Sequence, residues 1–209
     1  MFVYWVLMRF KSELDLYDGH DNYGLWNDGV LKKTSVFYLH GALHLYTRRV
    51  GNVRPEIQTW KFMYQDGYPI PAQVRDSIAN GRLHLFVSEG ESWQKRQRIR
   101  NNRYLRKANE QFGKACDDES AAVFTIGHSL NDVDQHITDL IGVGSATVFI
   151  GVHRPSDDGA QAMKVARRWA RARRDSGRPP LEIFLFDSSE CSIWGAPAQQ
   201  PILTLKVRL

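Results

Sequence analysis

The pattern of hydrophobic and polar positions is most regular in the second half of the chain. Short apolar runs rich in Val, Ile and Phe alternate there with longer segments whose apolar residues recur every three or four positions. The short runs are typical of buried strands, and the longer segments are typical of helices with one buried face. The pattern predicts strands at 121–126, 146–150, 181–186 and 202–207 and helices at 131–141 and 158–175. Because strands and helices alternate over short connections, we expect a parallel sheet flanked by helices, and therefore an α/β fold.

The first half of the chain has a less regular pattern. A short apolar run at 36–39 predicts a strand that delivers His40 to its C-terminal end. Elsewhere the pattern predicts a helix at 2–10, a loop at 12–35, a helix at 72–80, a strand at 83–87 and a long helix at 93–112. Residues 47–82 contain three prolines and Gly51, which is typical of an excursion from a central sheet. We therefore expect a single domain over residues 1–209, with a candidate small inserted module at 47–82.

The composition is that of an ordinary globular protein. Of the 209 residues, 43% are hydrophobic and 24% are charged, and a chain of this length can bury a core in one domain. No apolar run is long enough to span a bilayer, so we expect no membrane partner. The two cysteines, Cys116 and Cys191, make no disulfide framework and favour a reducing, cytoplasmic setting. The net charge of +5 permits an anionic partner but does not require one.

One candidate site follows the predicted strand at 121–126, where the chain reads Gly127-His128-Ser129 and continues to Asp132. Ligands in α/β proteins bind at this end of the strands, and glycine permits the backbone to approach them closely. The amides at the start of the next helix, together with the Ser129 hydroxyl, can bind a ribose or a phosphate. The alternative is structural, because Ser129 and Asp132 also fit the N-cap and the first turn of a helix.

The second candidate site is the pair His40-Gly41. A histidine at the end of a buried strand is either a general base or a buried residue that serves only packing and hydrogen bonding. His40 and His44 have the spacing of metal ligands on a helix, but they lie on a predicted strand and turn, with no neighbouring Cys. We therefore expect no metal at this site.

Two predicted helices carry clusters of basic residues. The clusters are Lys95, Arg96, Arg98, Arg100, Arg103, Arg106 and Lys107, and Lys164, Arg167, Arg168, Arg171, Arg173 and Arg174. Such clusters either form a solvated outer face or follow a phosphate backbone. Because no groove-reading motif or stacking residue accompanies them, we do not expect nucleic acid as a partner.

The two candidate sites together resemble the sirtuin-like NAD-binding families of bacteria, and in particular an uncharacterised branch classed as a domain of unknown function. The residues that carry the resemblance are Leu39-His40-Gly41 and Phe124-Thr125-Ile126-Gly127-His128-Ser129-Leu130-Asn131-Asp132-Val133-Asp134. In those families the second motif usually reads Ile-Gly-Tyr-Ser-Leu-Ser-Asp-Pro-Asp. The resemblance implies a Rossmann-like parallel sheet that takes NAD as its substrate and uses no metal.

By the same resemblance, His40 is the general base, and Gly41, Gly127, Ser129 and Asp132 bind the cofactor. Gly127 and Ser129 would hold the adenosine half of NAD. A neutral imidazole can accept a proton near neutral pH, which suits cleavage of the bond between nicotinamide and ribose. Because the chain lacks the four-cysteine zinc module of the deacylases, NAD hydrolysis is the expected family activity, and some relatives use it in antiviral defence.

The chain departs from those families before residue 10, where it has neither a glycine-rich phosphate loop nor an Asn-Tyr-Asp segment. We therefore expect the C-terminal portion of a sirtuin-like domain, incomplete at its N-terminus and inactive alone. The expected partner is NAD or a related nucleotide, and a homo-oligomer stays open. The alternatives are a basic α/β module that binds nucleic acid through residues 95–107, and a scaffold without catalysis.

Overall fold

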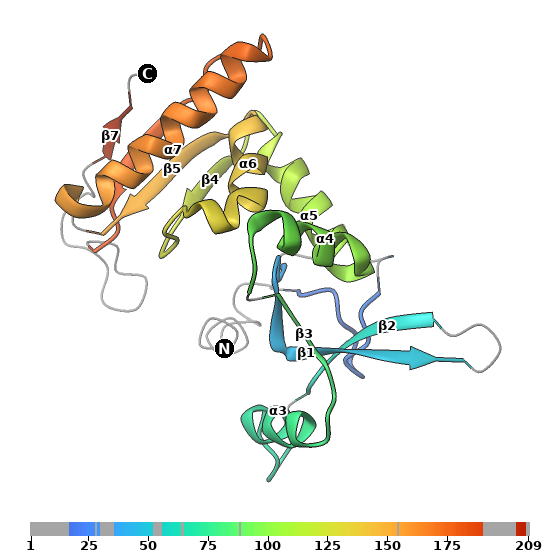
Figure 1. Ribbon diagram of the computed structural model, residues 1–209. Helices are drawn as coiled ribbons and strands as arrows, with labels where there is room; N and C mark the ends of the chain where they lie inside the picture. Colours follow the sequence, from blue (N-terminus) through green and yellow to red (C-terminus); the bar gives the residue numbers. More distant parts are fainter. Residues whose placement is uncertain are drawn as a thin grey trace. The chain divides into compact units, whose positions relative to one another are not determined.

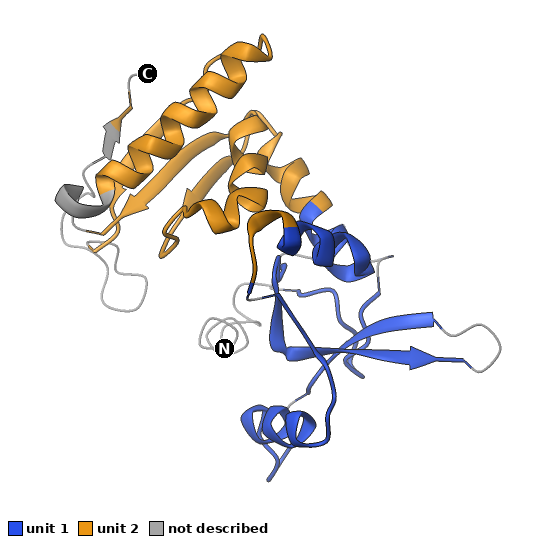
Figure 2. Cartoon of the chain, in the orientation of Figure 1, with its two compact units in different colours: residues 1–89, 94–109 blue, residues 90–93, 110–209 orange. Residues whose placement is uncertain are grey.

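The computed structural model describes residues 17–27, 29, 36–51, 56–63, 65–87, 89–153, 155–189 and 204–207. The helix expected at 2–10 lies outside the described residues. The chain forms two compact units, of which unit 1 comprises residues 1–89 and 94–109 and unit 2 comprises residues 90–93 and 110–209 (Figure 2). Residues 47–82, expected as an inserted module, belong to unit 1, where they include the end of one strand, the whole of its antiparallel partner and a helix.

Unit 2 contains the parallel sheet that the alternating pattern predicts (Figure 1). Its strands are β4 (Ala122–Thr125), β5 (Thr147–Val152), β6 (Ile183–Asp187) and β7 (Thr204–Lys206), in that spatial order. The pairs β4–β5 and β5–β6 are parallel, whereas β7 runs antiparallel to β6. The prediction of an α/β fold with a parallel sheet and flanking helices is therefore confirmed.

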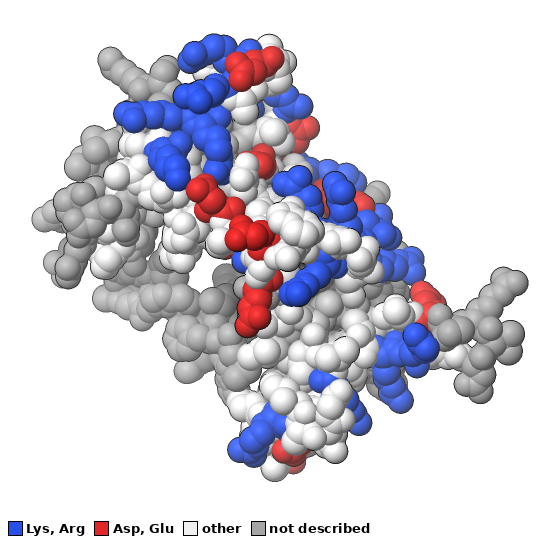
Figure 3. Space-filling view, in the orientation of Figure 1, with Lys and Arg blue, Asp and Glu red and all other residues white. Residues whose placement is uncertain are grey.

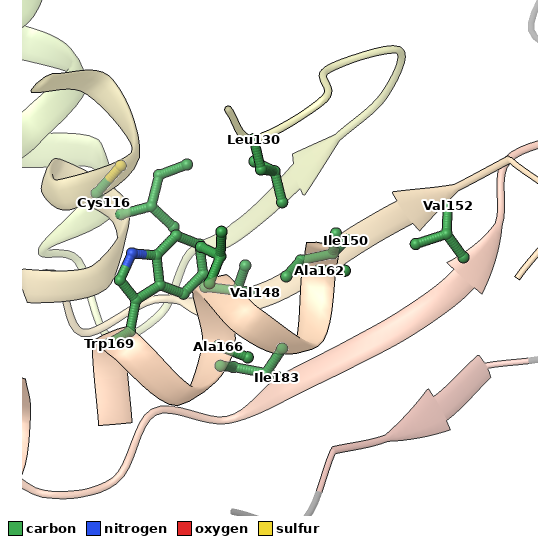
Figure 4. Close-up of a cluster of buried hydrophobic side chains, with 11 residues drawn as sticks. Cys116, Leu130, Val148, Ile150, Val152, Ala162, Ala166, Trp169 and Ile183 are labelled. Carbon is green, nitrogen blue, oxygen red and sulfur yellow. The ribbon is translucent and has the colours of Figure 1, made fainter. Parts of the chain in front are cut away.

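Two crossover helices of unit 2 pack on one face of this sheet. They are α6 (Gln135–Val143), preceded by the short 3-10 turn η2 (Asp132–Asp134), and α7 (Pro155–Asp175). Alternate side chains of β5 meet these helices because successive residues of a strand point to opposite faces. The core beneath the helices includes Val148, Ile150 and Trp169 (Figure 4).

The opposite face of the same sheet carries a row of phenylalanines. Phe124, Phe149 and Phe184 lie side by side on β4, β5 and β6, with ring centroids 4.5 and 5.0 Å apart. Phe124 stays 59% exposed at the end of the row. Within the described residues, the helices therefore cover one face of the parallel sheet more completely than the other.

Unit 1 is built around an antiparallel sheet. Its strands are β1 (Gly41–Val50), β2 (Glu56–Lys61) and β3 (His84–Phe86), in the order β2-β1-β3, and α3 (Ile70–Ala79) connects β2 to β3. The strand expected at 36–39 is wrong, because β1 begins only at Gly41. His40 therefore precedes an antiparallel strand instead of following a parallel one.

The long helix expected at 93–112 is two helices, α4 (Ser92–Asn101) and α5 (Arg103–Cys116). Asn102 separates them, and its side-chain oxygen accepts a hydrogen bond of 3.0 Å from the backbone N–H of Leu105. An asparagine in this position caps the new helix and so interrupts the old one. None of the helices in the described part of the chain combines the length and the apolar character that a membrane span requires.

Candidate functional site

A pocket of about 440 Å³ opens within unit 2, at the carboxyl ends of β4 and β5. The residues that line it come from the loop after β4, from the ends of β5 and β6, and from the start of α7. They are Gly127, His128, Ser129, Leu130, Asn131, Ile150, Gly151, Val152, His153, Gln161, Ala162 and Ser188. This volume is within the usual range for small-molecule sites, and the edge is the one where α/β sheets bind ligands.

The loop after β4 is held in a strained shape. Leu130 has a positive φ of 52° although it has a side chain, and that side chain is 2% exposed. Its N–H donates to Nδ1 of His128 over 2.9 Å, and its carbonyl accepts from Nε2 of Gln161 over 3.0 Å. A left-handed conformation of this kind costs on the order of 1–3 kcal/mol and persists only where the surroundings fix it. Strain in a loop that lines a pocket is a pointer to a ligand site.

The hydrogen bond to His128 also orders the imidazole. Since Nδ1 accepts from the Leu130 N–H, the ring carries a hydrogen on Nε2. Nε2 lies 3.7 Å from a carboxylate oxygen of Asp134, at the end of η2. This arrangement turns the ring back toward its own loop, so His128 serves mainly to shape the pocket wall.

Gly127 and Ser129 line the pocket, as expected of cofactor-binding residues. A Cβ atom at Gly127 would meet nothing within 4 Å, so this glycine is required for its positive φ of 66° and not for space. Ser129 does not occupy the N-cap expected by the structural alternative: the N-cap positions of η2 and α6 belong to Asn131 and Asp134, neither of which makes a side-chain capping hydrogen bond. The Ser129 side chain is exposed and accessible to a ligand.

Asp132 does not line the pocket. Its carboxylate lies 3.2 Å from Nζ of Lys164 and 2.9 Å from a guanidinium nitrogen of Arg168, both on α7. The hydrogen bond from Lys164 and the two positive charges lower the pKa of Asp132 below its ordinary value. The contacts visible in the structure therefore tie η2 to α7, and the cofactor role expected for Asp132 has no geometric support.

The pocket is lined by a mixture of polar and apolar side chains. Among the described lining residues there is no Asp, Glu, Lys or Arg. Ser129, Asn131 and Ser188 supply hydroxyl and amide groups, while the walls at Ile150 and Val152 are apolar. Such a mixture suits a neutral ring that carries hydroxyl groups better than it suits a phosphate.

Sequence reasoning missed several of these residues. Asn131, His153 and Ser188 all follow the carboxyl end of a parallel strand or lie in the loop that starts there. A position just after the carboxyl end of a predicted strand is the sequence feature that indicates such residues. The sequence shows Gly151 at the end of a predicted strand, but only the structure shows why glycine is needed there. A Cβ atom at this position would lie 2.7 Å from the carbonyl oxygen of Thr125.

His40 and Gly41 lie in unit 1, in a turn that leads into β1. The His40 carbonyl accepts a hydrogen bond of 2.8 Å from the N–H of Val87, and the residue is half-buried. Gly41 has a φ of 73°, and a Cβ atom there would lie 2.0 Å from the carbonyl oxygen of Leu85. The fold of unit 1 therefore demands a glycine at position 41. This turn leads into the antiparallel sheet of unit 1, whereas Gly127 follows a strand of the parallel sheet of unit 2, so the two motifs belong to different sheets.

His44 is a core residue of unit 1. Its side chain is 1% exposed, and its ring packs edge-on against Tyr38 with centroids 5.0 Å apart. Burial lowers the pKa of His44 from 6.5 to about 3. The charge of Asp18 opposes this shift, whereas His20 and Lys61 add to it. The imidazole is therefore neutral at physiological pH.

A buried charged pair in unit 1 had no signal in the sequence. Nζ of Lys61 lies 2.8 and 2.9 Å from the two carboxylate oxygens of Asp18, and both residues are less than a tenth exposed. Although burial raises the pKa of Asp18, hydrogen bonding to His20 and the charge of Lys61 hold it well below its ordinary value. The pair joins the turn around residues 17–27 to β2. For this turn the sequence predicts only a loop at 12–35.

The comparisons with known proteins complete this picture. No curated protein and no solved structure matches the sequence. One family model, described as a domain of unknown function (DUF4917), matches residues 1–194. Because the match covers most of the chain, the protein belongs to the DUF4917 family.

Proposed function

We propose that unit 2 binds the adenosine half of NAD, or of a related nucleotide, in the pocket at the edge of its parallel sheet. The observation that carries the proposal is the strained loop at 127–131, which borders a pocket at the carboxyl ends of β4 and β5. In open α/β sheets this edge is where nucleotides bind.

The chemistry of the pocket supports a nucleoside in particular. The apolar side chains of Ile150 and Val152 can contact a heteroaromatic ring, while Ser129 and Ser188 can hydrogen-bond to ribose hydroxyls. No Lys or Arg is among the described lining residues, so the groups they offer a phosphate are backbone amides, hydroxyl and amide groups, and the imidazoles of His128 and His153. The adenosine half of a dinucleotide therefore fits the pocket better than the pyrophosphate does.

The wider proposal is that the chain derives from an NAD-hydrolysing, sirtuin-like domain. The resemblance in the two motifs supports this lineage, with His40 as the general base that accepts a proton during nicotinamide release. His40 is half-buried in its turn, and its role rests on the resemblance and not on a visible geometry. The chain by itself is expected to bind a nucleotide without cleaving NAD.

The experiment is a calorimetric titration of the purified chain with adenosine, ADP-ribose and nicotinamide mononucleotide. Adenosine and ADP-ribose are expected to bind with similar affinity, because the pocket contacts the nucleoside. Nicotinamide mononucleotide is expected not to bind. The substitution Ser129→Ala should weaken adenosine binding about two- to tenfold, which corresponds to the loss of one hydrogen bond.

The matched control is Ser145→Ala, which also removes a serine hydroxyl. Ser145 lies two residues before β5, at the amino end of that strand and therefore away from the pocket. This variant should bind adenosine as the unchanged chain does. Absence of adenosine binding, or equal weakening by both substitutions, would contradict the assignment of the pocket.

A further inference from the structure

The outer face of α7 carries a regular stripe of basic side chains. Its inner face is formed by Ala162, Val165, Ala166 and Trp169, all buried in the core of unit 2. On the opposite face lie Lys164, Arg167, Arg171 and Arg174, spaced three or four residues apart and all exposed. We call these four residues the α7 stripe. Figure 3 shows Lys and Arg side chains gathered over this helix.

Most of the charge on the stripe is not neutralised by the described residues of the unit. Lys164 pairs with Asp132, whereas Arg167, Arg171 and Arg174 have no hydrogen-bond or ion-pair partner among the described residues. Like charges at i and i+4, such as Arg167 and Arg171, destabilise a helix by a few tenths of a kcal/mol. From residue 159 to the end of α7, Asp175 is the only acidic residue. A partner with regularly spaced negative charges would relieve this repulsion.

We propose that the α7 stripe binds the phosphate backbone of nucleic acid without reading its sequence. Successive stripe residues rise about 4.5–6 Å along the helix axis, so the guanidinium groups form a row that can follow one strand of a duplex. Guanidinium groups hydrogen-bond phosphate oxygens in pairs, which favours arginine over lysine in such a row. The stripe holds no aromatic residue that could stack on bases, so the contacts would be to the backbone alone.

The geometry favours nucleic acid over a membrane. Helices that bind lipid surfaces insert an apolar face, and the apolar face of α7 is already buried against the sheet.

The structure also favours the α7 stripe over the first basic cluster, at residues 95–107, as the surface that binds nucleic acid. In the segment 95–107, Lys95 is 6% exposed. Arg103 pairs with Glu56 over 3.1 Å, and Arg98 donates to the carbonyl of Glu89. The three arginines of the α7 stripe donate to no residue in the part of the chain that the structure describes. The proposal does not depend on the nucleotide pocket.

The test is fluorescence anisotropy with a labelled DNA duplex of about 20 base pairs, titrated with the whole chain at several salt concentrations. The variant R167Q/R171Q/R174Q should bind at least tenfold more weakly near 0.1 M salt. The slope of log K against log salt should fall by about 2.7, because each lost phosphate contact removes about 0.9. Thermal melting by circular dichroism establishes that the triple variant is folded. The single variant R171Q should bind DNA with an affinity between those of the unchanged chain and the triple variant.

The matched control is R96Q/R98Q/R100Q, which removes the same charge from exposed positions of α4. It should bind DNA as the unchanged chain does. Equal weakening by the two triple variants would show that net charge alone is responsible and would overturn the proposal. A lack of salt-dependent binding by the whole chain would also overturn the proposal. Displacement of the duplex by polyglutamate as effectively as by unlabelled DNA would overturn it too, and would indicate an acidic protein as the partner of the stripe.

Discussion

Single residues in this protein take their roles from neighbours that are distant in sequence. Gly41 was expected to approach a cofactor, because it follows a histidine at the end of an apolar run. The structure gives a different reason for glycine at this position, since its positive φ and the nearby carbonyl of Leu85 leave no room for a Cβ atom, and the cofactor role stays a prediction. His40 and His44 have the spacing of metal ligands on a helix. In the structure, His44 is instead a buried, neutral residue that packs against Tyr38.

The pH dependence of stability should report the burial of His44. Its pKa is about 3 in the folded state against 6.5 for an ordinary histidine. The unfolded chain therefore binds more protons between these values, and stability falls as the pH falls from 6.5. The slope from this residue is at most about 1.4 kcal/mol per pH unit. Urea denaturation at pH 7, 6.5, 6 and 5.5 measures it, because the carboxylates of the unfolded chain, with pKa values of about 4, stay largely ionised over this range.

The substitution His44→Phe should flatten this dependence in the same pH range, whatever it does to stability at pH 7. The same substitution at His153, which is exposed, should leave the slope unchanged. An unaltered slope in the His44 variant would mean that another group is responsible.

At the scale of elements, the ends of helices are fixed by contacts that cross from one element to another. The C-terminal carbonyls of α6 show this most clearly. Arg173 is 4% exposed, and it donates to the carbonyl oxygens of Gly142 and Gly144 over 3.3 and 2.5 Å and to that of Pro179 over 2.6 Å. Arg178 donates to the carbonyl of Val143. A positive charge at this end of a helix also complements the helix dipole.

We therefore predict that Arg173→Ala destabilises the protein by about 2–4 kcal/mol, since the carbonyls of the buried residues Gly142 and Gly144, and that of Pro179, lose their donor. Arg174→Ala, at the next and exposed position, should change stability by less than about 0.5 kcal/mol. Chemical denaturation followed by circular dichroism compares the two. Similar losses in both variants would argue against this role of Arg173.

At the scale of the whole molecule, the parallel sheet of unit 2 has its described helices on one face. Sheets that bind dinucleotides usually carry helices on both faces and bind at the point where the strand order reverses. The sequence order β4, β5, β6 runs in one direction across the sheet, so the described strands contain no such reversal. This arrangement can supply one wall of a dinucleotide site.

For this reason the purified chain is expected to release no nicotinamide from NAD above the rate in buffer, even at a nucleotide concentration that saturates binding. Chromatographic measurement of free nicotinamide tests this. Release that disappears in His40→Ala would contradict the expectation and would at the same time support His40 as the general base. The binding experiment is separate, because it does not need turnover.

The sequence by itself determined the elements whose signal is local. The alternating strands and helices from residue 121 onward, and the helix ending near Asn80, are in place within a few residues, because hydrophobic periodicity and turn residues act over short distances. The break at Asn102 was missed, although asparagine is a good capping residue, since the apolar stripe continues through it.

Only the tertiary structure decided which strands pair and which side chains meet. The sequence places Gly127 and Ser129 at a sheet edge, but it does not show that Ile150, His153 and Ser188 line the same pocket. Likewise, no local pattern shows that His40 precedes an antiparallel strand, or that Lys61 reaches Asp18. Strand pairing and buried ion pairs depend on segments far apart in the chain, and their energies depend on burial, which a local pattern does not contain.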